Sequence, residues 1–288
     1  MKTTKLTFGK YVLLSFLGLG LALSSCKKEE ETPKTDGATG PNYSAHVRAQ
    51  VPFMLKETGE LCPPCGSWAW TAWEGVINNL EGKALLFSQY STFYVSNSHF
   101  KNQELDPANS VMENFRANFP LANGKPYWYM NGLKFEYNDY TGAEAAALAS
   151  AATDAASVNI SAAYDIKWDG DKITVDAQAK LYENMNGNYF MGVYLIEDKA
   201  KGTQSGHPSG SNTVVEHHVV MRGSVEGGVW GKEIIATSAE AGTTVEKTYS
   251  VTVPSTYIKE NISVGIIIWK KNGAKYFYEN AATNQKGH

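Results

Sequence analysis

The amino-acid sequence predicts an α/β domain over residues 44–156, followed by an all-β antiparallel domain over residues 157–288. In the first segment, short apolar runs alternate with stretches of helical periodicity, which is typical of βαβ units. In the second segment, polar and apolar residues alternate along several short runs separated by turn residues, which is typical of antiparallel sheets. The chain of 288 residues is long enough for two domains.

Residues 1–25 are predicted to be a signal peptide. They contain a basic start and an apolar run, residues 11–23, which is too short to span a bilayer comfortably. A core helix is the alternative for this run, and its terminal position disfavours it. The run ends in Leu23-Ser24-Ser25-Cys26, which resembles a bacterial lipoprotein box. The resemblance implies that Cys26 carries lipid, palmitate included, and several acyl chains would anchor the protein stably to a membrane.

Residues 26–43 are predicted to form a lipidated tether, because they are polar and too poor in apolar residues to fold. The run KKEEE at residues 27–31 resembles a surface-export tag of Bacteroidetes lipoproteins, and a solvated linker is the alternative. Cleavage removes three lysines and no acidic residue, which lowers the formal net charge from −3 by three, to −6. This acidic balance disfavours nucleic acid as a partner.

The candidate site is Cys62-Pro63-Pro64-Cys65, at a predicted strand-to-helix junction in a compartment that permits disulfides. A strand is expected within residues 47–56, interrupted by Pro52, and a second, buried strand at residues 84–90. A helix is expected between them. Its apolar residues recur at a spacing typical of a core face rather than a cofactor site, and they are Trp68, Trp70, Trp73, Val76, Ile77 and Leu80. A helix N-terminus would favour a Cys62 thiolate, and Cys65, one turn later, is close enough to form a disulfide with it.

A second βα unit follows. Asp106-Pro107 is a typical helix start, and an amphipathic pattern continues from it to Phe119. A strand led by Pro126 then ends at the turn sequence Asn131-Gly132, and a capping box at residues 141–144 opens an alanine-rich helix.

Together these features resemble the thioredoxin fold. The resemblance implies that Pro126 is cis and lies against the disulfide, with the Lys125 backbone facing a substrate chain; Pro120 is a weaker candidate. The sequence departs from a standard thioredoxin at Leu61, where tryptophan is usual, and in its Pro-Pro bridge. No aspartate occupies the place of the buried acid, and Lys56 and Glu57 lie nearby instead. Glu57 is either the proton acceptor for Cys65 or a surface acid without a role.

The second segment contains about seven short strands punctuated by turns such as Asp169-Gly170-Asp171 and Asn272-Gly273, which predicts an immunoglobulin-like antiparallel sandwich. Several runs of the sequence resemble the Omp28-related outer membrane lipoprotein family. They are residues 193–198, 216–222 and 228–231 of this segment, together with Glu57-Thr58-Gly59 and the cysteine pair. The resemblance implies an outer-membrane location and a thioredoxin-like domain joined to a β-rich one.

Adjacent His217 and His218 raise the question of a metal site. Neighbouring residues of a strand point to opposite faces, so a paired structural role is favoured over metal ligation, and no metal or other cofactor is expected. The Gly/Ser-rich loop at residues 201–212 is a weak candidate for partner binding.

Two functions follow from these patterns, and a third, an accessory role in nutrient uptake, rests on the expected location alone. The first is thiol:disulfide exchange at an outer membrane, with Cys62, Cys65, Lys125, Pro126 and Glu57 as the site and protein or peptide disulfides as substrates. The alternative is a surface binding or structural lipoprotein, in which the Cys62–Cys65 disulfide is permanent and the β-domain binds a ligand.

Overall fold

The computed structural model describes residues 40–80, 82–91, 100, 105, 110–120, 124–135, 143–144, 146–147, 149–150 and 158–285. The predicted signal peptide, most of the tether, Cys26 and the helix starts at Asp106 and Thr141 lie outside these residues. Gly40–His288 form one compact unit.

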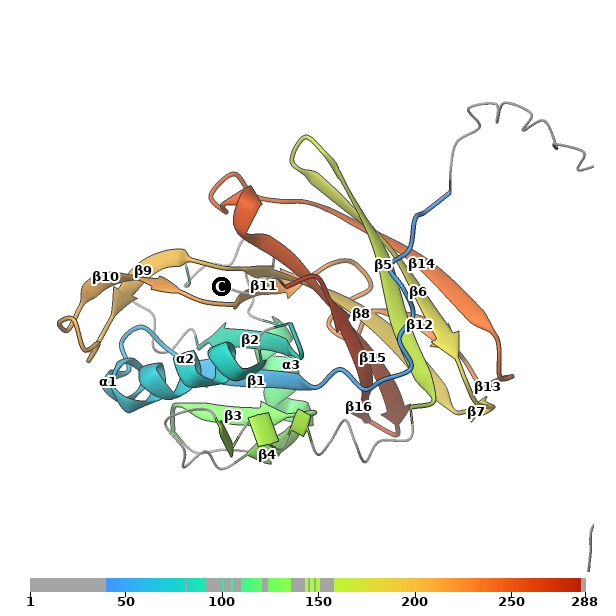
Figure 1. Cartoon of the computed structure of the whole chain (residues 1–288), viewed down its shortest axis with the longest axis horizontal. Helices are drawn as coiled ribbons and strands as arrows, with labels where there is room; N and C mark the ends of the chain where they lie inside the picture. Colours follow the sequence, from blue (N-terminus) through green and yellow to red (C-terminus); the bar gives the residue numbers. More distant parts are fainter. Residues whose placement is uncertain are drawn as a thin grey trace, which may run out of the picture. The chain divides into compact units, whose positions relative to one another are not determined.

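The first half contributes four strands in the order β2-β1-β3-β4 (Figure 1). β1 (Phe53–Thr58) and β2 (Leu85–Tyr90) are parallel, whereas β3 (Tyr127–Met130) is antiparallel to both β1 and β4 (Leu133–Phe135). Every residue of β1 and β2 is buried, which explains their mainly apolar sequences.

Helices of this half include α1 (Pro63–Gly66), α2 (Trp68–Leu80) and α3 (Ser110–Asn118). The sequence predicts one helix whose N-terminus lies at Cys62, but α1 ends at Gly66 and α2 begins at Trp68, so Cys65 lies on a separate single turn. The predicted core face is confirmed on α2, where Trp73, Val76 and Leu80 are buried. Trp68 is the exception, with 37% of its surface exposed.

The second half is built from antiparallel strands. One sheet consists of β5 (Ile160–Asp169), β6 (Lys172–Leu181) and β14 (Thr244–Thr252). Another sheet contains β8 (Asn188–Glu197), β15 (Ile262–Asn272) and β16 (Lys275–Thr283). The predicted hairpins at Gly170 and Gly273 are confirmed, and both glycines have positive φ. The shorter elements are β7 (Met185–Asn186), β9 (Ala200–Gln204), β10 (Thr213–His217), β11 (Val220–Ser224), β12 (Lys232–Ile235), β13 (Ser238–Ala239) and the 3-10 turn Lys259–Asn261.

One mixed sheet of nine strands runs through both halves. Its order is β16-β15-β8-β11-β2-β1-β3-β4, and β12 also pairs with β8. The junction is a parallel contact between β11 and β2, where Val220 pairs with Ser88 and the Ser88 N–H donates to the Val219 carbonyl at 2.7 Å. The sequence predicts a single strand over residues 213–225, but the chain turns at Val219, which has a φ of 50°, so that β10 and β11 enter different sheets.

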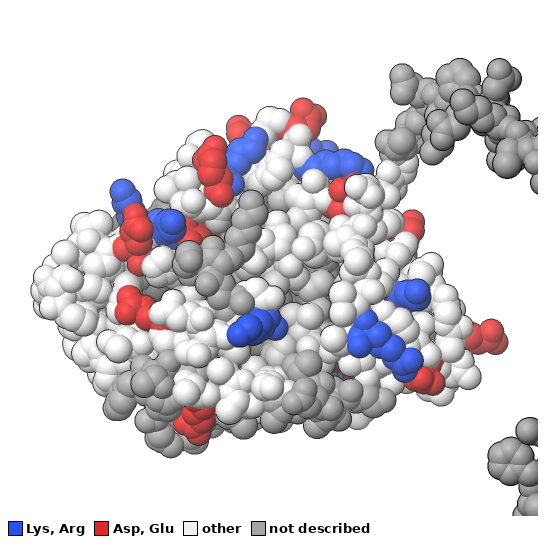
Figure 2. All heavy atoms as spheres, viewed as in Figure 1, with Lys and Arg blue, Asp and Glu red and all other residues white. Residues whose placement is uncertain are grey.

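The core joins the two halves as well. Trp269 of β15 packs edge-on against Phe53 of β1 at a centroid distance of 6.1 Å and lies 5.7 Å from Phe115 of α3. Its indole N–H donates to the Tyr194 hydroxyl at 2.9 Å. A second apolar cluster fills the space between the β6 sheet and the β8–β15 strands. On the face in Figure 2, basic and acidic side chains are interspersed over a mostly uncharged surface.

Candidate functional site

Cys62 and Cys65 form a disulfide at the start of α1, with a Cα–Cα distance of 5.2 Å. Cys62 is the N-cap residue, and its carbonyl accepts from the N–H groups of Cys65 at 3.0 Å and Gly66 at 3.3 Å. The two prolines suit this turn, because the first N–H groups of a helix have no intrahelical partner. Both cysteines are nearly covered, with 3% and 1% of their surfaces exposed.

The Lys125–Pro126 peptide bond is cis and leads into β3. The Lys125 carbonyl oxygen lies 3.8 Å from Sγ of Cys62, within reach of a Cys62 thiol once the disulfide is reduced. The structure therefore brings together Cys62, Cys65, Lys125 and Pro126, four of the residues singled out from the sequence. Pro120 follows α3, where its carbonyl accepts from the Tyr129 hydroxyl at 3.1 Å.

Glu57 is buried in β1, so its description as a surface acid is wrong. Its carboxylate forms ion pairs with Lys125 and with Arg116 of α3, the latter at 3.3 Å. Burial lowers the pKa of Lys125, whereas the neighbouring carboxylate favours its charged form. Glu57 thus supports the residue that precedes the cis-proline. Proton transfer between Glu57 and Cys65 stays a prediction.

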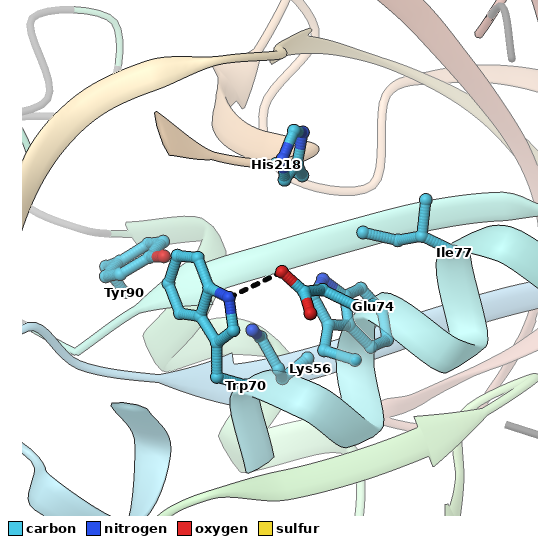
Figure 3. A pocket seen from close by; sticks show the side chains of 7 residues that line it. Lys56, Trp70, Glu74, Ile77, Tyr90 and His218 are labelled. Carbon is cyan, nitrogen blue, oxygen red and sulfur yellow. Dashed lines mark hydrogen bonds between the residues drawn. The ribbon is translucent and has the colours of Figure 1, made fainter. Parts of the chain in front are cut away.

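Lys56 points away from solvent on the α2 side of β1. Its amine lies 5.1 Å from the Trp73 ring centre and 5.8 Å from that of Trp70. It borders a cavity of about 10 Å³, which is the space of about one water molecule, and Glu74 and His218 also line this cavity (Figure 3). Burial lowers the pKa of Lys56 to about 7, although the Glu74 carboxylate opposes the change. The sequence signal for this feature is a lysine inside a mainly apolar strand, near the place where the thioredoxin resemblance implies a buried acid.

The second half supplies one wall of the site. The β9–β10 hairpin lies beside α1 and α2 (Figure 1), and the buried Gln204 side chain contacts the cysteine loop (residues 59–66). This hairpin includes the Gly/Ser-rich loop at residues 201–212. Nothing local in residues 201–212 indicates that they meet the cysteines, because the contact depends on how the two halves pair.

The two histidines have different neighbours. His217 is buried against Trp70 and Phe100, and its Nδ1 shares a hydrogen bond of 2.5 Å with the Tyr90 hydroxyl. Burial lowers the pKa of His217 to about 3. His218 instead bonds to the Asp198 carboxylate at 2.8 Å. Within the described part of the chain, no three His, Cys, Asp or Glu side chains gather in a way that could hold a metal ion.

Apolar residues surround the disulfide on its solvent side. Leu61 is 43% exposed, and Pro63, Pro64 and Trp68 are exposed as well. An incoming chain that meets Cys62 would therefore contact apolar side chains and the Lys125 backbone.

Comparisons with known proteins identify a family for most of the second half and part of the first. The family model for outer membrane protein Omp28 matches residues 112–281. No curated protein matches the chain. None of the helices in the described ranges combines the length and apolar character needed to cross a membrane.

Two of the solved structures that are similar to this chain come from the same organism. HBP35 of Porphyromonas gingivalis aligns with a TM-score of 0.64 and 10% identity, covering 83% of this chain and 76% of that one, so the two share a fold. A domain of the outer membrane lipoprotein Omp28 from the same organism is 21% identical, with a TM-score of 0.31, over 46% of this chain and 91% of that one.

Proposed function

Because this chain belongs to the outer membrane protein Omp28 family, we propose that it is an outer-membrane thiol:disulfide exchange protein acting through Cys62 and Cys65. The observation that carries the proposal is the position of the disulfide, which lies at the start of a helical turn and against the carbonyl of the cis Lys125–Pro126 bond.

The proposal includes a thioredoxin-like fold for residues 44–156 and an immunoglobulin-like sandwich for residues 157–288. The first is supported by the order β2-β1-β3-β4, in which β1 and β2 are parallel and the next two strands antiparallel. The second is supported by the apolar cluster shared between the β6 sheet and strands β8 and β15.

The proposed exchange is a pair of substitutions at sulfur. In the reduced protein, the Cys62 thiolate attacks a substrate disulfide, a mixed disulfide forms, and the displaced substrate sulfur takes up a proton. The Cys65 thiolate then attacks Sγ of Cys62, which releases the second substrate sulfur and restores the Cys62–Cys65 bond. The substrate gains two electrons, and a second dithiol must return them to this protein for another cycle.

The Cys62–Cys65 reduction potential tests this function. We expect a value in the range of known exchange proteins, about −120 to −270 mV. We also expect Cys65→Ser to accumulate mixed disulfides with envelope proteins, because the resolving thiol is gone. Recovery of no adducts, together with a potential below about −300 mV, would sink the exchange function.

The near-complete burial of both sulfurs favours a second candidate, in which the disulfide is permanent and the protein binds a ligand through its β-rich half. This candidate predicts a potential below about −300 mV and no reaction with added dithiols in the folded state.

Membrane attachment is proposed through lipid on Cys26, supported by the lipoprotein box. Cys26→Ser should abolish incorporation of labelled palmitate and release the protein from membranes. Protease treatment of intact cells tests the orientation, since export to the cell surface predicts digestion and a periplasmic orientation predicts protection.

A further inference from the structure

The β9–β10 hairpin holds the cysteine loop through one buried amide. Nε2 of Gln204 lies 3.2 Å from the Gly59 and Glu60 carbonyl oxygens and 3.3 Å from that of Cys62. Next to it, the Ser205 N–H donates to the Glu60 carbonyl at 2.7 Å. Gln204 itself is 1% exposed, so these contacts are shielded from water.

Two glycines allow the hairpin and the loop to approach this closely. A Cβ atom at Gly66 would lie 2.1 Å from the Ser205 carbonyl oxygen. A Cβ at Gly206, whose φ is +77°, would lie 2.4 Å from the Pro63 carbonyl oxygen. Backbone therefore packs directly on backbone, and any side chain at either position would separate the hairpin from the cysteines.

The amide has a distinct electrostatic role here. The carbonyls that face Gln204 also accept backbone N–H groups, because the Cys62 N–H donates to Gly59 at 3.3 Å and the N–H groups of Cys65 and Gly66 donate to Cys62. The two hydrogens of the Gln204 amide are shared among these carbonyls and that of Ser205, at 3.1 Å, and they place positive partial charge beside the Cys62 backbone. Positive partial charge near a thiol favours its thiolate form.

We infer that Gln204 is a positioning residue for Cys62, which holds the cysteine loop in place and stabilises negative charge on the Cys62 sulfur. This inference rests on the proposed exchange function and extends the site to an element of the second half. It also gives the hairpin a role in the chemistry beyond joining β8 to β11.

The test compares three variants of the full chain. Gln204→Met removes the amide and keeps the length of the side chain, and Gln204→Glu replaces it with a carboxylate of the same shape. Gln285→Met is the matched control, because that amide donates to the Leu86 carbonyl at 2.8 Å but contacts no residue of the cysteine loop. The measurement is the pH dependence of Cys62 alkylation in the reduced proteins, together with the equilibrium between each protein and dithiothreitol.

We expect the thiolate fraction of Cys62 at neutral pH to fall at least about threefold in both Gln204→Met and Gln204→Glu, since neither side chain supplies the two N–H donors of the amide. Their disulfides should become harder to reduce by a similar factor, and the control should match the wild type. Unchanged alkylation profiles in both folded variants, or an equal change in Gln285→Met, would overturn the inference.

If Gln204→Met does not fold, the alkylation profile of the isosteric Gln204→Glu decides the role of Gln204. The outcomes also separate this inference from the exchange function. A wild type that exchanges with no substrate, while the Gln204 variants still alter Cys62 alkylation, refutes only the exchange function. Normal exchange with unaltered Cys62 reactivity in the variants refutes only the role of Gln204.

Discussion

Replacing Lys56 with methionine should stabilise this protein, and the gain should depend on pH. Methionine keeps an unbranched apolar side chain against Trp70 and Trp73 and removes only the buried amine. The pKa of Lys56 is lowered from 10.5 to about 7 by burial, so the folded state disfavours the charged form. Methionine has no charge to bury, and the penalty disappears.

The sign and size follow from proton linkage. Between the folded pKa near 7 and the unfolded pKa near 10.5, the unfolded chain binds a proton on Lys56 that the folded chain does not. The wild type therefore gains stability as pH rises through this window and loses it on acidification. At about 1.4 kcal/mol per pH unit, the charge penalty is about 4 kcal/mol at pH 7 and about 2 kcal/mol at pH 9.

Urea denaturation of both oxidised proteins at these two pH values measures the effect. The stability gained by Lys56→Met should be about 2 kcal/mol smaller at pH 9 than at pH 7. The contacts that the lysine amine makes with the tryptophan rings are lost at both pH values, so they do not affect this difference. Lys172→Met, at an exposed position of β6, is the control and should show no such change. An advantage that is equal at both pH values would refute the reasoning, because it would mean that the buried amine does not change its protonation on unfolding.

Three other substitutions test how the site and the two halves are held together. Gly206→Ala should lower the free energy of unfolding by at least about 2 kcal/mol more than Gly273→Ala does. Both glycines have positive φ, but only at Gly206 would a Cβ atom meet backbone, at 2.4 Å. Equal losses for the two variants in urea denaturation would contradict the close packing. Glu197→Gln should cost about 3–5 kcal/mol, because it leaves the fully buried Arg222 guanidinium without its carboxylate, and a loss under 1 kcal/mol in thermal unfolding would count against it. Trp269→Ala should cost about 3–5 kcal/mol and keep one cooperative transition by both near- and far-ultraviolet circular dichroism. Two separate transitions would show that the halves fold independently.

Local signals in the sequence were sufficient for much of the fold. Alternation along residues 172–181 predicts a strand with one buried face, and β6 has that burial pattern. Turn residues place the hairpins at Gly170 and Gly273 correctly, because positive φ is a property of one or two residues. The sequence also indicates the cysteine pair at a strand-to-helix junction and the Lys125-Pro126 dipeptide, since both are short motifs.

The sequence by itself determined which residues are candidates for the site, while the tertiary structure decided what surrounds them. Pairing of β11 with β2, the contact of Gln204 with the cysteine loop, and the ion pairs of Glu57 all join residues far apart in the chain. No local pattern encodes such contacts. They depend on which strand edges and buried polar groups find partners when the whole chain packs, and they set the burial and charge on which the reactivity of Cys62 depends.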